Sequence, residues 1–89
     1  MVTVIKFSAE WCGPCRMLAP AFNQMKSEFG PDVQFVDYDV DNSPDQAVRY
    51  GITSVPNVVI EKNGVMLEKL VGAKPIISYK NSINKALVG

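Results

Sequence analysis

The segment Cys12-Gly13-Pro14-Cys15 constrains the fold of this 89-residue chain more than any other, because different patterns flank it. Residues 2–7 form a short apolar run interrupted by Lys6, which predicts a buried strand. After the segment, apolar residues recur at steps of three and four, which predicts a helix with one apolar face. These residues are Leu18, Phe22, Met25 and Phe29. The chain must therefore turn from a strand into a helix at the cysteine pair.

The remaining segments continue the alternation. Gly30-Pro31 ends the first helix, and Pro20 predicts a kink inside it. A second strand is expected at residues 33–38. A short helix follows, which begins with a capping box formed by Ser43 and Gln46 and ends near Gly51. Strands at residues 57–61 and 65–71 flank an Asn63-Gly64 hairpin turn, and Pro75 opens a last helix with an apolar face of Ile76, Tyr79, Ile83 and Leu87.

The order strand, helix, strand, helix, strand, strand, helix predicts the fold class. A strand–helix–strand unit makes a parallel pair with a right-handed crossover. The hairpin then adds an antiparallel strand at an edge, and helices cover both faces of the apolar strands. We expect one α/β domain over residues 1–89, with a four-stranded mixed sheet.

Charge and hydropathy exclude several classes of function. Nine basic and nine acidic residues are interspersed and cancel, so the chain lacks the basic patch of a nucleic-acid-binding protein. No apolar run is long enough to span a bilayer. The N-terminus has no signal-peptide pattern, so we expect a cytoplasmic protein that acts away from membranes, as a monomer.

The two cysteines are the candidate reactive groups, and the chain has no histidine. A bond between residues three apart closes too small a loop to stabilise a fold well, so the pair indicates redox chemistry or half of a metal site. A helix start lowers the pKa of a thiol placed there, which favours Cys12 as nucleophile and the less exposed Cys15 as the resolving thiol. Two other interpretations stay open: an inert buried pair, and a metal site shared between two chains. We expect no metal and no cofactor beyond the Cys12–Cys15 disulfide.

Four motifs together give the chain a resemblance to the thioredoxin family. In order they are Phe7-Ser8-Ala9-Glu10-Trp11-Cys12-Gly13-Pro14-Cys15-Arg16 followed by Pro20, Tyr50-Gly51-Ile52 with Ser54-Val55-Pro56, Lys62-Asn63-Gly64, and Val71-Gly72. The resemblance runs over almost the whole chain and implies a thioredoxin-like fold. It also implies a thiol-disulfide oxidoreductase that reduces protein disulfides and is recycled by a donor resembling thioredoxin reductase.

The resemblance also implies roles for residues around the cysteines. Pro56 matches a proline that in this family follows a cis peptide bond facing the cysteines, which would leave the backbone of Val55 to pair with an extended substrate. An apolar docking surface would surround Cys12, made of Trp11, Gly13, Pro14, Val55, Gly72 and Ala73. The alternative for Trp11 is a partly buried core aromatic.

The chain departs from the family at two places. Its first strand already leads to the cysteines, whereas full-length thioredoxins carry a further strand and helix, so the strand around Phe35 is expected at an open edge. Lys6 stands where thioredoxins usually have a buried aspartate, and Asp37 stands where a lysine is common. We hypothesise that Lys6 and Asp37 face each other beneath the cysteines, with Asp37 or solvent as proton acceptor for Cys15. The alternative is that both side chains extend into solvent.

Two further functions compete with the leading one. A glutaredoxin-like enzyme recycled by glutathione fits the size, although Gly13-Pro14 differs from the Pro-Tyr typical of that family. A binding or assembly module with the same fold would not need the two thiols.

Overall fold

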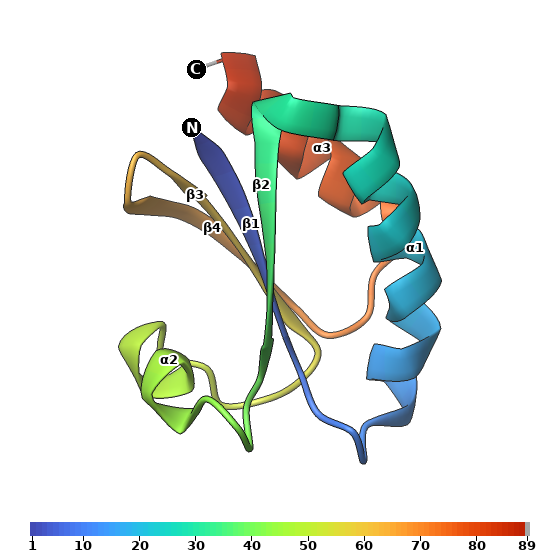
Figure 1. The fold of residues 1–89 in the computed structure, drawn as a ribbon, viewed down its shortest axis with the longest axis vertical. Helices are drawn as coiled ribbons and strands as arrows, with labels where there is room; N and C mark the ends of the chain where they lie inside the picture. The colour runs from blue at the N-terminus through green and yellow to red at the C-terminus, as the bar shows by residue number, and fades with distance from the viewer. Residues whose placement is uncertain (89) are drawn as a thin grey trace.

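The computed structural model describes residues 1–88, and its elements follow the expected order (Figure 1). The strands are β1 (Val2–Ser8), β2 (Val33–Asp39), β3 (Asn57–Lys62) and β4 (Val65–Val71). The helices are α1 (Gly13–Phe29), the 3-10 turn η1 (Gly30–Asp32), α2 (Pro44–Arg49) and α3 (Ile76–Val88).

The four strands form one mixed sheet in the order β2-β1-β3-β4. β1 pairs in parallel with β2 and antiparallel with β3, and β3 pairs antiparallel with β4. The predicted α/β class and four-stranded mixed sheet are confirmed. Within residues 1–88, β2 forms one edge of the sheet, as expected for the strand around Phe35.

Side chains alternate between the two faces of β1, and each face has its own cluster. Val2 and Val4 belong to the cluster that contains residues of α1 and α3, whereas Ile5 and Phe7 belong to a second cluster. α1 and α3 cover one face of the sheet, and α2 lies on the other side (Figure 1). The larger cluster lies under α1 and α3. Its most deeply buried members include Val4, Phe22, Met25, Ile60, Tyr79 and Ile83.

The local structure agrees with the sequence-based predictions, except at the start of α2 and on the buried face of α3. Asn63 and Gly64 both have positive φ, 53° and 82°, as a tight hairpin requires. The capping box expected at Ser43 and Gln46 is absent, because ψ of Ser43 is 58° and its side chain makes no capping hydrogen bond. The α2 helix instead begins with backbone bonds from Gln46 and Ala47 to the Ser43 carbonyl. In α3, Ala86 is buried where Leu87 was expected.

Candidate active site

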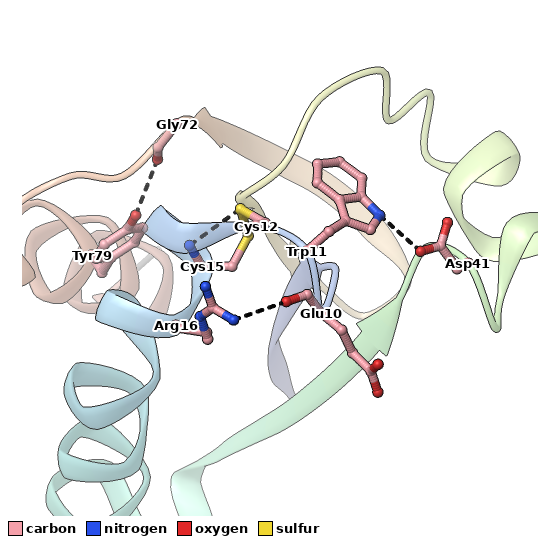
Figure 2. Close-up of a disulfide and its surroundings, with 8 residues drawn as sticks. All are labelled: Glu10, Trp11, Cys12, Cys15, Arg16, Asp41, Gly72 and Tyr79. Atoms are coloured by element: carbon pink, nitrogen blue, oxygen red, sulfur yellow. Dashed lines mark hydrogen bonds between the residues drawn. A yellow bond between two sulfur atoms is a disulfide. The ribbon is translucent and has the colours of Figure 1, made fainter.

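The cysteine pair lies where β1 passes into α1. Cys12 is the N-cap of α1 and has an extended backbone, with φ −92° and ψ 108°. Its Sγ accepts a hydrogen bond from the backbone N–H of Cys15 at 3.2 Å (Figure 2). The two cysteines form a disulfide, and their Cα atoms are 5.3 Å apart. Pro14 fits the first turn of the helix because an N–H there has no helical partner.

Burial does not distinguish the two thiols. Cys12 is 5% exposed and Cys15 is 4% exposed, so the expected difference in exposure between them is only one percentage point in the disulfide form. Both belong to a small buried cluster with Ala9, and Val40 and Val55 pack against this cluster. The two cysteines differ in their position relative to α1, because Cys12 is the N-cap and Cys15 lies within the first turn. Negative charge on Cys12 Sγ is stabilised by the N–H of Cys15 and by the positive end of the helix dipole.

Two loops from distant parts of the chain meet beside the disulfide. The Val55–Pro56 peptide bond is cis, as the resemblance implies. Val55 packs against the cysteines, and the Pro56 carbonyl accepts a 2.9 Å hydrogen bond from the Gly72 N–H. The loops at Pro56 and Gly72 are therefore tied together, and Ala73 beyond them is exposed.

Trp11 is 68% exposed beside the disulfide, so it is not a core aromatic (Figure 2). Its indole Nε1 donates a 2.9 Å hydrogen bond to Asp41 Oδ2, which holds the ring at the rim of the site. A pocket of about 150 Å³ opens next to it, lined by Trp11, Val40, Ile52, Thr53, Ser54 and Val55. The sequence reasoning missed Asp41, which lies thirty residues away, and no local pattern pointed to it.

Lys6 and Asp37 face each other across the parallel pair of β1 and β2. Lys6 Nζ is 3.4 Å from Asp37 Oδ1, and the lysine side chain is only 11% exposed. The ammonium also lies 5.1 Å from the centre of the Phe22 ring. Asp37 is 45% exposed at the sheet edge and also binds Lys26, 3.0 Å away. The Lys6 side chain is therefore mostly buried, whereas the Asp37 side chain is about half exposed.

A cleft of about 180 Å³ reaches Cys15 from the side of β2. It is lined by Lys6, Ser8, Ala9, Glu10, Cys15, Arg16, Ala19 and Asp39. Asp37 is not among the lining residues, and Asp39 is the residue of β2 that lines this cleft. Asp39 Oδ1 accepts backbone hydrogen bonds from Asp41 at 2.9 Å and Asn42 at 3.4 Å. The sequence reasoning missed Asp39. It considered Asp37 as the proton acceptor, and Asp39 lies two residues further along the same strand, so the two side chains share a face.

Residues 1–88 contain neither a metal-binding cluster nor a membrane-spanning helix. That part of the chain contains no cluster of three or more histidine, cysteine, aspartate or glutamate side chains placed to hold a metal ion. Among the same residues, no helix has the length and hydropathy needed to cross a bilayer.

A disulfide at a helix N-terminus, beside a cis-proline loop on a four-stranded mixed sheet, is the arrangement of the thioredoxin fold. The family model described as Thioredoxin matches residues 1–85. Thioredoxin H2 of Arabidopsis thaliana is 48% identical over 71 residues, which are 80% of this chain and 53% of that protein. Thioredoxin of Bacillus subtilis (strain 168) is 37% identical over 86 residues, which are 97% of this chain and 83% of that protein. The chain belongs to the thioredoxin family.

Solved structures agree with the family match. Thioredoxin NaTrxh from Nicotiana alata superposes with a TM-score of 0.90 at 38% identity, covering 96% of this chain and 72% of that one. Mitochondrial thioredoxin 3 from Saccharomyces cerevisiae, in its oxidised form, gives a TM-score of 0.87 at 38% identity, covering 94% of this chain and 77% of that one. The chain spans only about half the length of two relatives from Arabidopsis thaliana, 53% of Thioredoxin H2 and 44% of the chloroplastic Thioredoxin M4.

Proposed function

We propose that this chain is a thiol-disulfide oxidoreductase that reduces disulfides in other proteins through Cys12 and Cys15. The observation that carries the proposal is the position of Cys12 Sγ at the N-cap of α1, where it accepts the Cys15 N–H. A thiolate there is stabilised near neutral pH and can act as nucleophile.

The reaction takes two thiol–disulfide exchanges. In the reduced protein, the Cys12 thiolate attacks one sulfur of the substrate disulfide, which forms a mixed disulfide and releases one substrate thiolate. The Cys15 thiolate then attacks Cys12 Sγ, which restores the Cys12–Cys15 disulfide and releases the second substrate thiolate. The substrate gains two electrons and the two cysteines lose two.

The residues around the disulfide support a docking role for extended protein segments. Trp11, Gly13 and Pro14 stand on the α1 side. The loops of Val55–Pro56 and Gly72–Ala73 stand on the other side and are held together by the Gly72 bond to Pro56. A substrate segment would pair with the Val55 backbone and place a side chain in the pocket beside Trp11.

Lys6 and the β2 carboxylates supply the charge beneath the cysteines. A buried ammonium near Cys15 favours the thiolate form of both thiols. The proton that leaves Cys15 enters the cleft lined by Asp39, so Asp39 acts as its acceptor through solvent. Asp37 suits this role less well, because it does not line the cleft and already pairs with Lys6 and Lys26.

We also propose an electron donor and a compartment for this chain. A donor resembling thioredoxin reductase would reduce the disulfide, and the reduced chain would act as a monomer in the cytoplasm. A dithiol of this kind fits a reducing compartment. The even charge balance supports partners other than nucleic acid or membrane.

Insulin reduction with two recycling systems tests the proposal. We expect turnover with NADPH and thioredoxin reductase, and loss of turnover in Cys12→Ser. Turnover with glutathione and its reductase alone would favour the glutaredoxin-like alternative. Full biological function of the Cys12→Ser, Cys15→Ser double variant would favour a binding or assembly module.

A further inference from the structure

Tyr79 is a buried tyrosine whose hydroxyl lies away from the cysteines and makes two hydrogen bonds to one loop. The phenol donates to the Gly72 carbonyl at 3.3 Å (Figure 2). It accepts from the Lys74 N–H at 3.2 Å. Tyr79 belongs to α3, and its ring is fully buried. It packs against the Phe22 ring of α1, with ring centres 5.5 Å apart.

The loop that Tyr79 binds has few other attachments. Residues 72–75 join β4 to α3 without regular structure, and Ala73, Lys74 and Pro75 are exposed. Gly72 has φ +83°, a conformation that residues with a side chain rarely adopt. Its N–H is already bound to the Pro56 carbonyl, so Gly72 is held on one side by the cis-proline loop and on the other by Tyr79.

A continuous series of contacts therefore joins both docking loops to the helix that carries the cysteines. Pro56 is bound to Gly72, Gly72 to the Tyr79 hydroxyl, and the Tyr79 ring to Phe22. Phe22 is on α1, two turns after Cys15. Removing the hydroxyl breaks the series at one atom and leaves the ring packing in place.

We propose that Tyr79 is a positioning residue for protein substrates: its hydroxyl fixes the Gly72–Lys74 loop, and through Gly72 the Pro56 loop, at the docking surface beside Cys12. The proposal rests on the proposed function. A preordered surface binds its partner more tightly because less loop entropy is lost on docking. The role concerns substrate affinity and not the reactivity of the thiols.

Tyr79→Phe tests the proposal in the full chain. We expect KM for insulin to rise about two- to ten-fold, the range for loss of an ordinary hydrogen bond, with kcat unchanged. The rate with a small synthetic disulfide, which touches little of the docking loop, should stay the same. Tyr50→Phe is the matched control, because it removes a phenol bound to Glu61 and not to this loop.

Amide hydrogen exchange gives a readout independent of activity. The Lys74 amide should exchange faster in Tyr79→Phe than in the wild-type chain, and Tyr50→Phe should leave it unchanged. Unaltered Lys74 protection, an unaltered KM, or an equal loss of rate with insulin and the small disulfide would each overturn the inference. If the wild-type chain reduced no protein disulfide, the proposed function would fail, while the exchange measurement would still decide whether Tyr79 holds the loop.

Discussion

Lys6 Nζ lies 3.4 Å from Asp37 Oδ1, on strands that place the two residues directly opposite each other. Lys6 is among the residues that line the cleft that reaches Cys15, and Asp37 is not. The two charges therefore have different parts in the site. We expect Lys6 to act on the thiols, whereas the Asp37 carboxylate compensates the charge of the buried ammonium.

Replacing Lys6 should make the thiols harder to ionise. Lys6→Met removes the cation, and Lys6→Asp adds a negative charge, so both should raise the pKa of the cysteines, the second by more. The thiolate ultraviolet absorbance of the reduced protein, followed against pH, measures the change. Lys26→Met is the control, because it removes the other cation on Asp37 outside the cleft. A fall in pKa, or no change, would refute this role of Lys6.

The two carboxylates of β2 should differ in their effect on the resolving step. Asp39→Asn removes the acceptor in the cleft, so attack by Cys15 on the mixed disulfide should slow by about ten-fold or more. Asp37→Asn keeps the cleft intact and should have much less effect on this rate. Quenched-flow analysis of the mixed disulfide in a single turnover measures both variants. If the two variants resolved the mixed disulfide at equal rates, Asp39 would not be the proton acceptor of this step.

The hydrogen bond from Trp11 to Asp41 should limit the motion of the indole. Asp41→Ala frees the exposed ring, and we expect KM for insulin to rise about two- to five-fold, the effect of about 0.5–1 kcal/mol. Trp11 is the only tryptophan in the sequence, so its fluorescence anisotropy reports the motion directly and should fall. Glu68→Ala removes an exposed carboxylate on β4 and should change neither value. Unchanged anisotropy in Asp41→Ala would show that the bond does not hold the ring.

Alkaline pH should destabilise the fold partly through Tyr79. Burial raises the pKa of Tyr79 above its ordinary value of 10.0, although the Lys74 N–H acts in the opposite direction. The folded chain therefore holds this proton more tightly than the unfolded chain. Its contribution is fully present below about pH 10 and is lost as pH rises through the folded pKa. Urea unfolding of wild type and Tyr79→Phe should show a stability difference that shrinks over this range.

A second tyrosine is expected to contribute to the same alkaline loss. The pKa of Tyr50 is also raised, by burial first and then by its hydrogen bond to Glu61. Each of the variants Tyr79→Phe and Tyr50→Phe should therefore reduce the loss of unfolding free energy at alkaline pH, and each should remove only its own share of that loss. Parallel stability curves for wild type and Tyr79→Phe would contradict the assignment to Tyr79.

Most of the fold could be predicted because its signals are local. The period of the apolar residues distinguished the strands from the helices, and Asn63-Gly64 determined the hairpin. The prediction of a capping box at Ser43 is wrong, because the ψ angle of Ser43 differs from the one that a capping side chain needs. Whether Leu87 or Ala86 is buried depended on how α3 lies on the sheet.

The sequence by itself determined the reactive centre. Cys12 and Cys15 are three residues apart at a strand-to-helix junction, so their placement at the helix N-terminus follows from local structure alone. The opposition of Lys6 and Asp37 could also be anticipated, because both interrupt apolar strands that were expected to pair.

Only the tertiary structure decided what surrounds the cysteines. The bond from Trp11 to Asp41, the presence of Asp39 in the cleft to Cys15, and the hold of Tyr79 on Gly72 each depend on how the elements pack. Side-chain hydrogen bonds form only within about 3.5 Å, and packing sets such distances between segments that are far apart in the chain.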